Sequence, residues 1–584
     1  MLASLNYPNI GSIYGLEEAE GVRALVLVDG PTLADRIAKG PIQGAEAPGA
    51  EQLKRSGHET GEPMRYALTR RQALALIGIG TAVPFWAACG PGERAVGTTD
   101  PPAPTADSGG APLHYMSLRD VARLIEAREF SPVELTETML DRIAAVDGRL
   151  KSYATVMRVR AMTAARAAEA EIQGGRYRGP LHGVPIAVKD LCYTRGVRTM
   201  GALAVLRDFV PDFDATVVAR LQDAGAIILG KLNLTEGAMA GYHPDFDIPV
   251  NPWDGGLWTG VSSSGSGVAT AAGLCFGSLG SDTGGSIRFP AAQCGLVGLK
   301  PTWGRVSRYG VLELAGSLDH IGPMTRSVAD AAIMFEAIAG VDPNDATTRI
   351  EPLEPVLRTL DGGVGGVRLG IDRRYASEGV DPAVSAAVDE AVDTLAQLGA
   401  EVVDVEMPAA PFADWGTICS YEAARAHAGN FPARADEYGP YFGQFLVNGS
   451  AVTDQQYAVA GRRRAAFSQR FHAMLASIDA LVCPSNIAAL PLVDGMGYDS
   501  IADFGRALAS IAERFDPPLG SIQLFTAPAD FAGTPTISLP CGFSANDAPY
   551  SLQLVGRDLS EATLCRIAHA YEQATGWHMR HPDV

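Results

Sequence analysis

The chain lacks closely spaced cysteines, and this absence limits the sites that it can form. A zinc site or a compact disulfide framework needs cysteines or histidines a few residues apart. The eight cysteines of the 584 residues are scattered, so the sequence indicates neither. Cys192, Cys275 and Cys294 lie in apolar surroundings, which predicts buried thiols. The eight positions are 89, 192, 275, 294, 419, 483, 541 and 565.

Basic residues are scarce relative to acidic ones. The chain has 47 Lys and Arg against 66 Asp and Glu, a formal net charge of −19. Such a balance opposes binding to a phosphate backbone, so we expect no nucleic-acid partner. With 47% hydrophobic residues the chain can bury a sizeable core, in one large domain or two.

A phosphate-binding signature is missing from the two glycine-rich clusters, residues 260–267 (GVSSSGSG) and 282–286 (DTGGS). Neither ends in Gly-Lys-Ser/Thr or follows the dinucleotide fingerprint, and the sequence implies no cofactor. A flexible linker is also unsuitable, because the apolar stretch SIRFPAAQCGLVGLKP follows. Small and apolar residues over Val268–Leu279 predict a buried helix that brings the clusters together.

The second cluster fits a serine nucleophile at Ser286. Residues with small side chains let the backbone curl, so that successive N–H groups form an oxyanion hole. The predicted hole consists of the N–H groups of Thr283, Gly284, Gly285 and Ser286. A serine hydroxyl is a poor nucleophile near neutral pH, so an adjacent base is required.

Lys189 is the favoured base. It follows the apolar run Val184–Val188, which predicts a buried strand, and desolvation favours the neutral form of an amine. Two alternatives stay open. His182 or His320, each in a predicted turn, could be the base, or Lys189 could form a structural ion pair with Asp190.

Three separated motifs resemble the amidase signature family. They are PIAVKD at 185–190, DTGGSIRFPAAQCGLVGLKPTWGRVSRYG from Asp282, and SLDHIGPMTRSVADAA at 317–332, and the similarity extends from about Met116 to the C-terminus. The resemblance implies Ser286 as nucleophile, Ser262 as a second serine behind a cis peptide bond, and Lys189. The two serines are 24 positions apart (286 minus 262), as in the family. Ser263, Asp282 and Arg288 are expected to support them.

The resemblance implies hydrolysis of an amide C–N bond, with a small-molecule amide, aryl amide, peptide amide or carbamate as substrate. Two positions depart from the family pattern, since Val261 and Ser264 stand where glycines are usual. A catalytically inactive binding protein is therefore one alternative. Another is the amidotransferase subunit that releases ammonia from glutamine for tRNA-bound glutamate. We expect a monomer or a homodimer.

Alternating helix and strand patterns predict an α/β fold, and the resemblance implies an α/β/α sandwich with a mixed sheet. Expected helices are 161–173, 215–224 and 384–398, and expected strands are 226–230, 367–371 and 401–405. Residues 408–528 are expected to wall the acyl pocket, with Trp415, Tyr421, Tyr441 and Phe442 as candidate lining residues. Arg462 to Arg464 are interpreted as a solvated helix face.

The N-terminal region predicts export. Residues 1–63 have no sustained period and are expected to be disordered or not translated, while 64–89 have the parts of a signal: Arg70–Arg71, an apolar run and small residues before Cys89. The run is too short for an ordinary membrane span. Residues 90–112 predict a tether, and 113–584 the catalytic domain. We expect a periplasmic protein or one anchored by a lipid at Cys89, or a cytoplasmic one if the signal is not used.

Overall fold

The computed structural model describes residues 13–19, 22–27 and 112–584. The chain divides into two compact units, Met1–Pro104 and Thr105–Val584. In the first unit, β1 (Ile13–Ala19) and β2 (Val22–Leu27) pair as an antiparallel hairpin that the sequence analysis missed. The predicted signal at 64–89 and all but the last residue of the predicted tether lie outside the described residues.

The second unit is built on one eleven-stranded sheet with the order β10-β9-β11-β13-β12-β7-β8-β6-β4-β5-β3. Its strands are β3 (Tyr153–Val156), β4 (Pro185–Lys189), β5 (Ile227–Leu232), β6 (Gly277–Asp282), β7 (Val297–Lys300), β8 (His320–Thr325), β9 (Arg368–Ile371), β10 (Glu401–Asp404), β11 (Ala480–Pro484), β12 (Thr536–Phe543) and β13 (Pro549–Val555).

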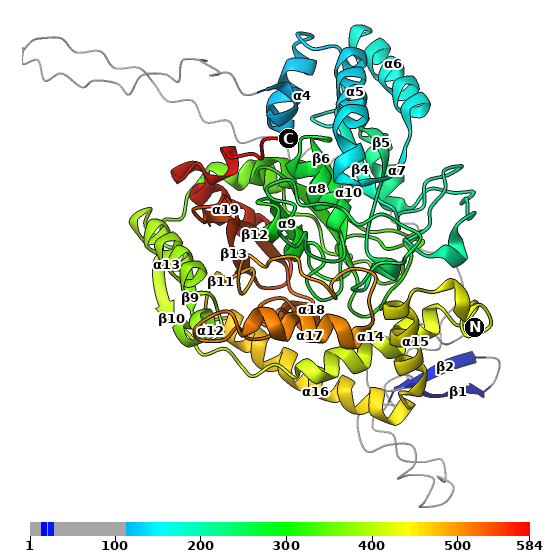
Figure 1. Ribbon diagram of the computed structural model, residues 1–584, viewed down its shortest axis with the longest axis vertical. Coiled ribbons are helices and arrows are strands. Elements are labelled where there is room, and N and C mark those ends of the chain that lie inside the picture. The colour runs from blue at the N-terminus through cyan, green and yellow to red at the C-terminus, as the bar shows by residue number, and fades with distance from the viewer. Residues whose placement is uncertain (1–12, 20–21, 28–111) are drawn as a thin grey trace, which may run out of the picture. The chain divides into compact units, whose positions relative to one another are not determined.

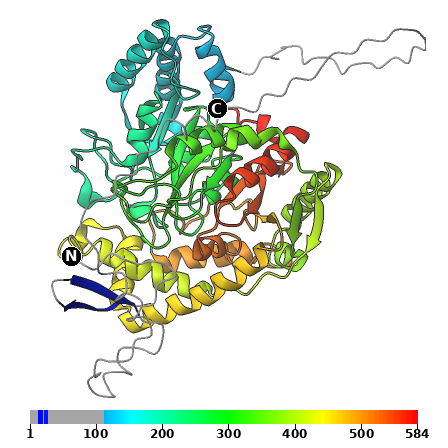
Figure 2. The same cartoon turned by 180° about the vertical axis from the view of Figure 1, so that it is seen from behind.

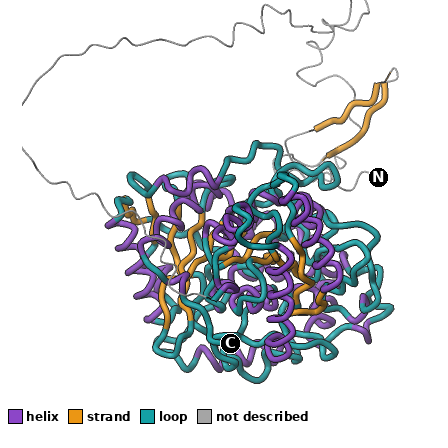
Figure 3. Tube along the Cα trace, turned by 90° about the horizontal axis from the view of Figure 1, so that it is seen from above, coloured by secondary structure: helices purple, strands orange, loops and turns teal. Residues whose placement is uncertain are grey.

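The sheet is mixed, as predicted. Strands β5, β4 and β6 run parallel at one side, and β10, β9 and β11 run parallel at the other. Between them β13, β12, β7 and β8 pair antiparallel. The central strands are buried on both faces, which fits their continuous apolar sequences. Figure 3 shows the strands lying between helices.

Helices cover the sheet in two groups of contacting neighbours. One group joins α7 to α10, α10 to α19 and α19 to α13, and the other joins α8 to α9 and joins α14, α16 and α18. Figures 1 and 2 show α4, α5 and α6 at the top of both views and α14 to α17 at the bottom. The helices are α4 (Leu118–Glu126), α5 (Pro132–Leu150), α6 (Arg158–Gln173), α7 (Thr216–Asp223), α8 (Ser264–Ala271), α9 (Arg288–Gln293), α10 (Val328–Ile338), α11 (Val356–Thr359), α12 (Arg373–Ser377), α13 (Pro382–Gln397), α14 (Phe412–Ala426), α15 (Pro440–Ala451), α16 (Asp454–Leu475), α17 (Ile501–Ala512), α18 (Ala527–Ala532) and α19 (Glu561–Ala574).

Local sequence explains where several of these helices begin. The hydroxyl of Ser117 accepts the N–H of Asp120, and the hydroxyl of Ser131 accepts the N–H groups of Val133 and Glu134, with a proline at the first helical position. These contacts satisfy N–H groups that a helix start leaves unpaired. The remaining predicted helices and strands also form, within about two or three residues of the expected bounds.

The predicted helix Val268–Leu279 is wrong. Helix α8 ends at Ala271, and strand β6 begins at Gly277. Gly273 ends the helix because it adopts a φ of +65°, and a Cβ there would lie 2.8 Å from the carbonyl oxygen of His114. A short run of small apolar residues has no period that separates a buried helix from a buried strand, so the sequence pattern did not separate them.

Candidate active site

Two parallel strands bring Lys189 to the first glycine-rich cluster. β4 ends at Lys189 and β6 ends at Asp282, and because these strands are parallel neighbours their carboxyl ends meet at one edge. The Lys189 side chain is fully buried, and its Nζ lies 2.7 Å from Ser262 Oγ, 2.8 Å from Ser263 Oγ and 2.8 Å from Ser281 Oγ. Three hydroxyls thus surround the amine.

Burial lowers the pKa of Lys189 from 10.5 to about 7, and nearby acidic groups offset only part of this effect. The interpretation of Lys189 as an ion pair with Asp190 is wrong, because Asp190 lies 3.1 Å from Lys231 and accepts the N–H of Met200 at 3.0 Å. The amine is therefore available as a proton acceptor near neutral pH.

The first glycine-rich cluster has the predicted cis peptide bond between Val261 and Ser262. Gly260 precedes it with a φ of +75°, and a Cβ there would lie 2.7 Å from the backbone of Phe289 and Pro290. The two departures from the family pattern are accommodated. Val261 lines the main cavity, and the hydroxyl of Tyr242 donates to Ser264 Oγ at 2.9 Å.

The carboxylate of Asp282 builds the turn that carries Ser286. It accepts the N–H groups of Gly285 at 2.7 Å and of Ile287 at 3.0 Å. Gly285 is therefore a correction to the predicted oxyanion hole, because its N–H is already bound to Asp282. The N–H groups of Thr283, Gly284 and Ser286 donate no hydrogen bond within the part of the chain that the structure describes, and all three residues line the cavity.

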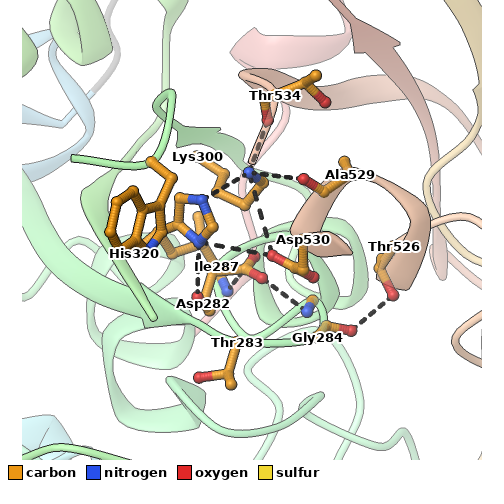
Figure 4. Close-up of polar contacts among 12 residues, drawn as sticks. Asp282, Thr283, Gly284, Ile287, Lys300, His320, Thr526, Ala529, Asp530 and Thr534 are labelled. Atoms are coloured by element: carbon orange, nitrogen blue, oxygen red, sulfur yellow. Dashed lines mark hydrogen bonds and ion pairs between the residues drawn. The ribbon is translucent and has the colours of Figure 1, made fainter. Parts of the chain in front are cut away.

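A buried charge network holds this turn from behind. Arg288 donates to both oxygens of Asp282, at 2.9 and 3.0 Å, and to Asp530 at 2.8 Å. Burial alone would raise the pKa of Asp282, but the charge and hydrogen bonds of Arg288 hold it well below its usual range. Figure 4 shows Lys300 between His320 and Asp530, and Thr526 close to Gly284. Thr526 Oγ1 donates to the Gly284 carbonyl at 2.6 Å.

Neither histidine is placed as a base for Ser286. His320 is buried in this network, where Lys300 Nζ lies 3.2 Å from its Nε2 and the Asp282 carbonyl lies 3.2 Å from its Nδ1. Lys300 is the donor to Nε2, so Nδ1 carries the proton and donates to Asp282, and burial lowers the pKa of His320 well below 6.5. His182 accepts the N–H of Arg178 and lies beside Glu171.

A cavity of about 480 Å³ opens onto Ser286, whose residue is 9% exposed. Its lining carries no Asp, Glu, Lys, Arg or His, and most of it is apolar. Of the candidate lining residues, Trp415 and Tyr441 line this cavity as predicted. Tyr421 and Phe442 do not, because Tyr421 stacks on Tyr457 and the ring of Phe442 is buried against Gly237. The remaining wall is α17 together with residues 519–523.

Arg464 corrects the predicted solvated face of α16. Its guanidinium donates to the carbonyl oxygens of Phe531 at 2.9 Å and Ser317 at 2.8 Å, so it joins α16 to two distant loops. Arg463 lies 3.3 Å from Asp414 and is largely exposed.

Comparison with known proteins agrees with this geometry. The family model described as Amidase matches residues 134–565. The chain belongs to the amidase family. The amidase candidate AmiD of Mycobacterium tuberculosis is 46% identical over 477 residues, which cover 81% of this chain and 97% of AmiD. The glutamyl-tRNA(Gln) amidotransferase of Geobacter metallireducens has an A-type chain that is 39% identical over 490 residues, 81% of this chain and 100% of that one. The solved peptide amidase of Stenotrophomonas maltophilia has a TM-score of 0.66 and 31% identity, covering 80% of this chain and 97% of its own.

Family membership confirms the resemblance read from the motifs, and the amidase hydrolyses amide C–N bonds. Within the described residues, no three His, Cys, Asp or Glu side chains are grouped as a metal ion requires. No helix of the described part is long and apolar enough to cross a membrane. The seven described cysteines are buried free thiols, which confirms the prediction for residues 192, 275 and 294.

Sequence reasoning missed several residues of the amidase site. Asp319 accepts the hydroxyl of Thr283 at 2.6 Å and the N–H groups of Leu314 and Ala315 at 3.0 Å, and burial raises its pKa to about 7. The motif SLDHIGP contains Asp319, so that residue could have been found. Thr526 is distant in the sequence from every motif quoted above, and nothing in its local pattern marks it.

Proposed function

We propose that this amidase hydrolyses an uncharged, largely apolar carboxylic amide through an acyl-enzyme on Ser286. The observation that carries the proposal is the position of Ser286 in a cavity whose lining has no charged side chain. A buried charge without a partner is costly, so such a cavity favours neutral substrates.

The proposed first half-reaction forms the acyl-enzyme. Neutral Lys189 takes the Ser262 proton while Ser262 takes the proton of Ser286, whose Oγ bonds to the carbonyl carbon. The developing oxyanion is stabilised by the N–H groups of Thr283, Gly284 and Ser286. When the C–N bond breaks, the proton returns through Ser262 to the leaving nitrogen.

In the second half-reaction, water takes the place of the amine and the same groups release the acid. The hydroxyls of Ser262 and Ser286 share no hydrogen bond in this structure, and we expect one to form when substrate fills the cavity, since catalytic contacts often tighten on binding. Ser263 also donates to the Ser281 carbonyl, at 3.2 Å, which holds it in place and makes Ser262 the better relay.

The substrate class follows from the cavity. An acyl or aryl amide, a C-terminal peptide amide with apolar side chains, or a carbamate fits the lining, and the likeness to a peptide amidase supports this class. The ammonia-releasing alternative is less suitable, because glutamine carries an ammonium and a carboxylate that this lining would leave unpaired. An inactive binding protein is disfavoured by the hydroxyls gathered around Lys189.

The test is a comparison of the purified chain with Ser286→Ala. Wild type should hydrolyse hexananilide far faster than glutamine and should react with a fluorophosphonate, with mass spectrometry finding one adduct on Ser286. Ser286→Ala should lose both activities. An adduct on Ser262, Ser263 or Ser264, or preferential hydrolysis of glutamine, would refute the proposal.

We also propose that residues 64–89 are an export signal, supported by Arg70–Arg71 and the small residues before Cys89. The mature chain should begin after residue 80 and reside in the periplasm or on a lipid anchor at Cys89. N-terminal sequencing that recovers Met1 in the isolated protein would contradict this.

A further inference from the structure

The turn at residues 282–286 has a regular pattern of held carbonyls. In a planar trans peptide, the C=O of one residue and the N–H of the next point in opposite directions. Holding a carbonyl therefore fixes the direction of the following N–H. The proposed oxyanion donors are the N–H groups of Thr283, Gly284 and Ser286, so the carbonyls that decide their directions belong to Asp282, Thr283 and Gly285.

Each of these three carbonyls is bound by a donor. His320 Nδ1 lies 3.2 Å from the Asp282 carbonyl, and the N–H of Phe289 donates to the Gly285 carbonyl at 2.7 Å. The indole Nε1 of Trp415 donates to the Thr283 carbonyl at 2.9 Å. The Phe289 bond is part of the local chain, whereas the His320 and Trp415 bonds come from β8 and α14.

Trp415 differs from the other two donors because its indole N–H is a side-chain group that also belongs to the cavity wall. Its ring packs directly on the turn, since a Cβ on Gly284 would lie 2.6 Å from indole Cζ2. The side chain is 7% exposed, so the Nε1–H bond is sheltered from water. One side chain thus contacts both the space for the acyl group and the peptide whose N–H faces that space.

We propose that Trp415 is a positioning residue that directs the Gly284 N–H at the oxyanion. This inference rests on the proposed acyl-enzyme mechanism. The indole donates to one end of the 283–284 peptide, and the opposite end donates to the charge that develops on the substrate oxygen. Because the same ring forms a cavity wall, an acyl group that packs against it holds the donor in its productive direction.

The test removes only the indole N–H. Trp415→Phe keeps an aromatic wall, and β-(3-benzothienyl)alanine at position 415 keeps the ring size with sulfur in place of N–H. Trp253→Phe is the matched control, because Trp253 Nε1 donates to the Cys294 carbonyl at 2.8 Å and does not line the cavity. Each variant is assayed on hexananilide, with hexanal and hexan-1-ol as inhibitors.

Removing an oxyanion donor costs about 100- to 1,000-fold in kcat, and releasing one should cost less, roughly 10- to 100-fold. We expect that fall in kcat for both position-415 variants, with KM changed by less than about twofold. Inhibition by hexanal, which forms a tetrahedral adduct on Ser286, should weaken in parallel with kcat/KM. Inhibition by hexan-1-ol, which only fills the cavity, should stay within about twofold.

Two outcomes would overturn the inference. If kcat in the position-415 variants equals that of Trp253→Phe, the indole N–H has no role in the reaction. If hexanal and hexan-1-ol weaken equally, Trp415 is only a wall. Should Trp415→Phe fail to fold, the benzothienyl variant decides. Failure of the proposed mechanism is separate, since it would leave wild type unlabelled by fluorophosphonate or Ser286→Ala active.

Discussion

The pKa of Lys189 gives a quantitative prediction for the pH dependence of hydrolysis. If the base is an amine with a pKa of about 7, then about 9% of it is neutral at pH 6 and about 90% at pH 8. kcat/KM on a neutral anilide should therefore rise about tenfold between these pH values and stay nearly constant from pH 8 to 10. An unperturbed pKa of 10.5 would instead give a rise of roughly 75-fold from pH 8 to 10.

Asp319 is the required control, because its pKa is also raised to about 7 by burial and it holds Thr283 next to the site. Asp319→Asn should lower the rate while keeping the rise between pH 6 and 8. Loss of that rise in Asp319→Asn, or a rise that continues to pH 10 in wild type, would refute the assignment of Lys189. The other charged groups near Lys189 are Asp282 and Cys192, whose pKa values lie well below and well above this range.

The same shift makes a prediction for stability. The folded-state pKa is lower than the unfolded one, so the unfolded chain binds more protons between pH 7 and 10.5 and stability rises with pH there. The slope is at most about 1.4 kcal/mol per pH unit. Lys189→Met lacks this contribution, so the free energy of unfolding in urea should grow more from pH 7 to 9 in wild type than in the variant. Equal growth would show that the native amine is not depressed in pKa.

Two further predictions concern the two glycine-rich clusters. Ser262→Ala should keep fluorophosphonate labelling of Ser286 at a reduced rate and should lose more activity on hexananilide than on a matched hexanoate ester, because an alcohol leaves without the proton that an amine needs; equal losses would refute the relay. Gly284→Ala should lose activity strongly, since its Cβ would lie 2.6 Å from the Trp415 ring, whereas Gly416→Ala on α14, where a Cβ meets nothing within 4 Å, should match wild type in kcat; equal rates for the two variants would contradict the tight packing of the turn.

The local parts of this structure could be predicted from the sequence. The apolar run before Lys189, the capping serines at 117 and 131, and the alternation of helices and strands each depend on neighbouring residues. The spacing of Ser262 and Ser286, read with the family motifs, led to the placement of the hydroxyls around Lys189 and to the cis bond at Val261.

The parts that failed depend on contacts between distant segments. A glycine at position 285 fits an oxyanion hole by composition, but the carboxylate of Asp282 binds its N–H first. Arg464 has a solvated pattern along α16, yet carbonyls of two other loops surround it. The roles of Thr526 and Trp415 arise only when α18 and α14 pack beside the turn, and no local pattern carries that information.

The division of the cavity between two sources has a consequence for how this amidase could change its substrate. The reacting groups lie at the ends of β4 and β6, while much of the cavity wall comes from α17 and residues 519–523, more than 200 positions later in the chain. Substitutions in α17 can therefore alter the shape offered to the acyl group while the strand ends keep their hydrogen bonds. Trp415 is the exception, because a change there alters recognition and rate together. Selection for a new acyl group should accordingly accumulate changes in 501–523 and leave position 415 untouched.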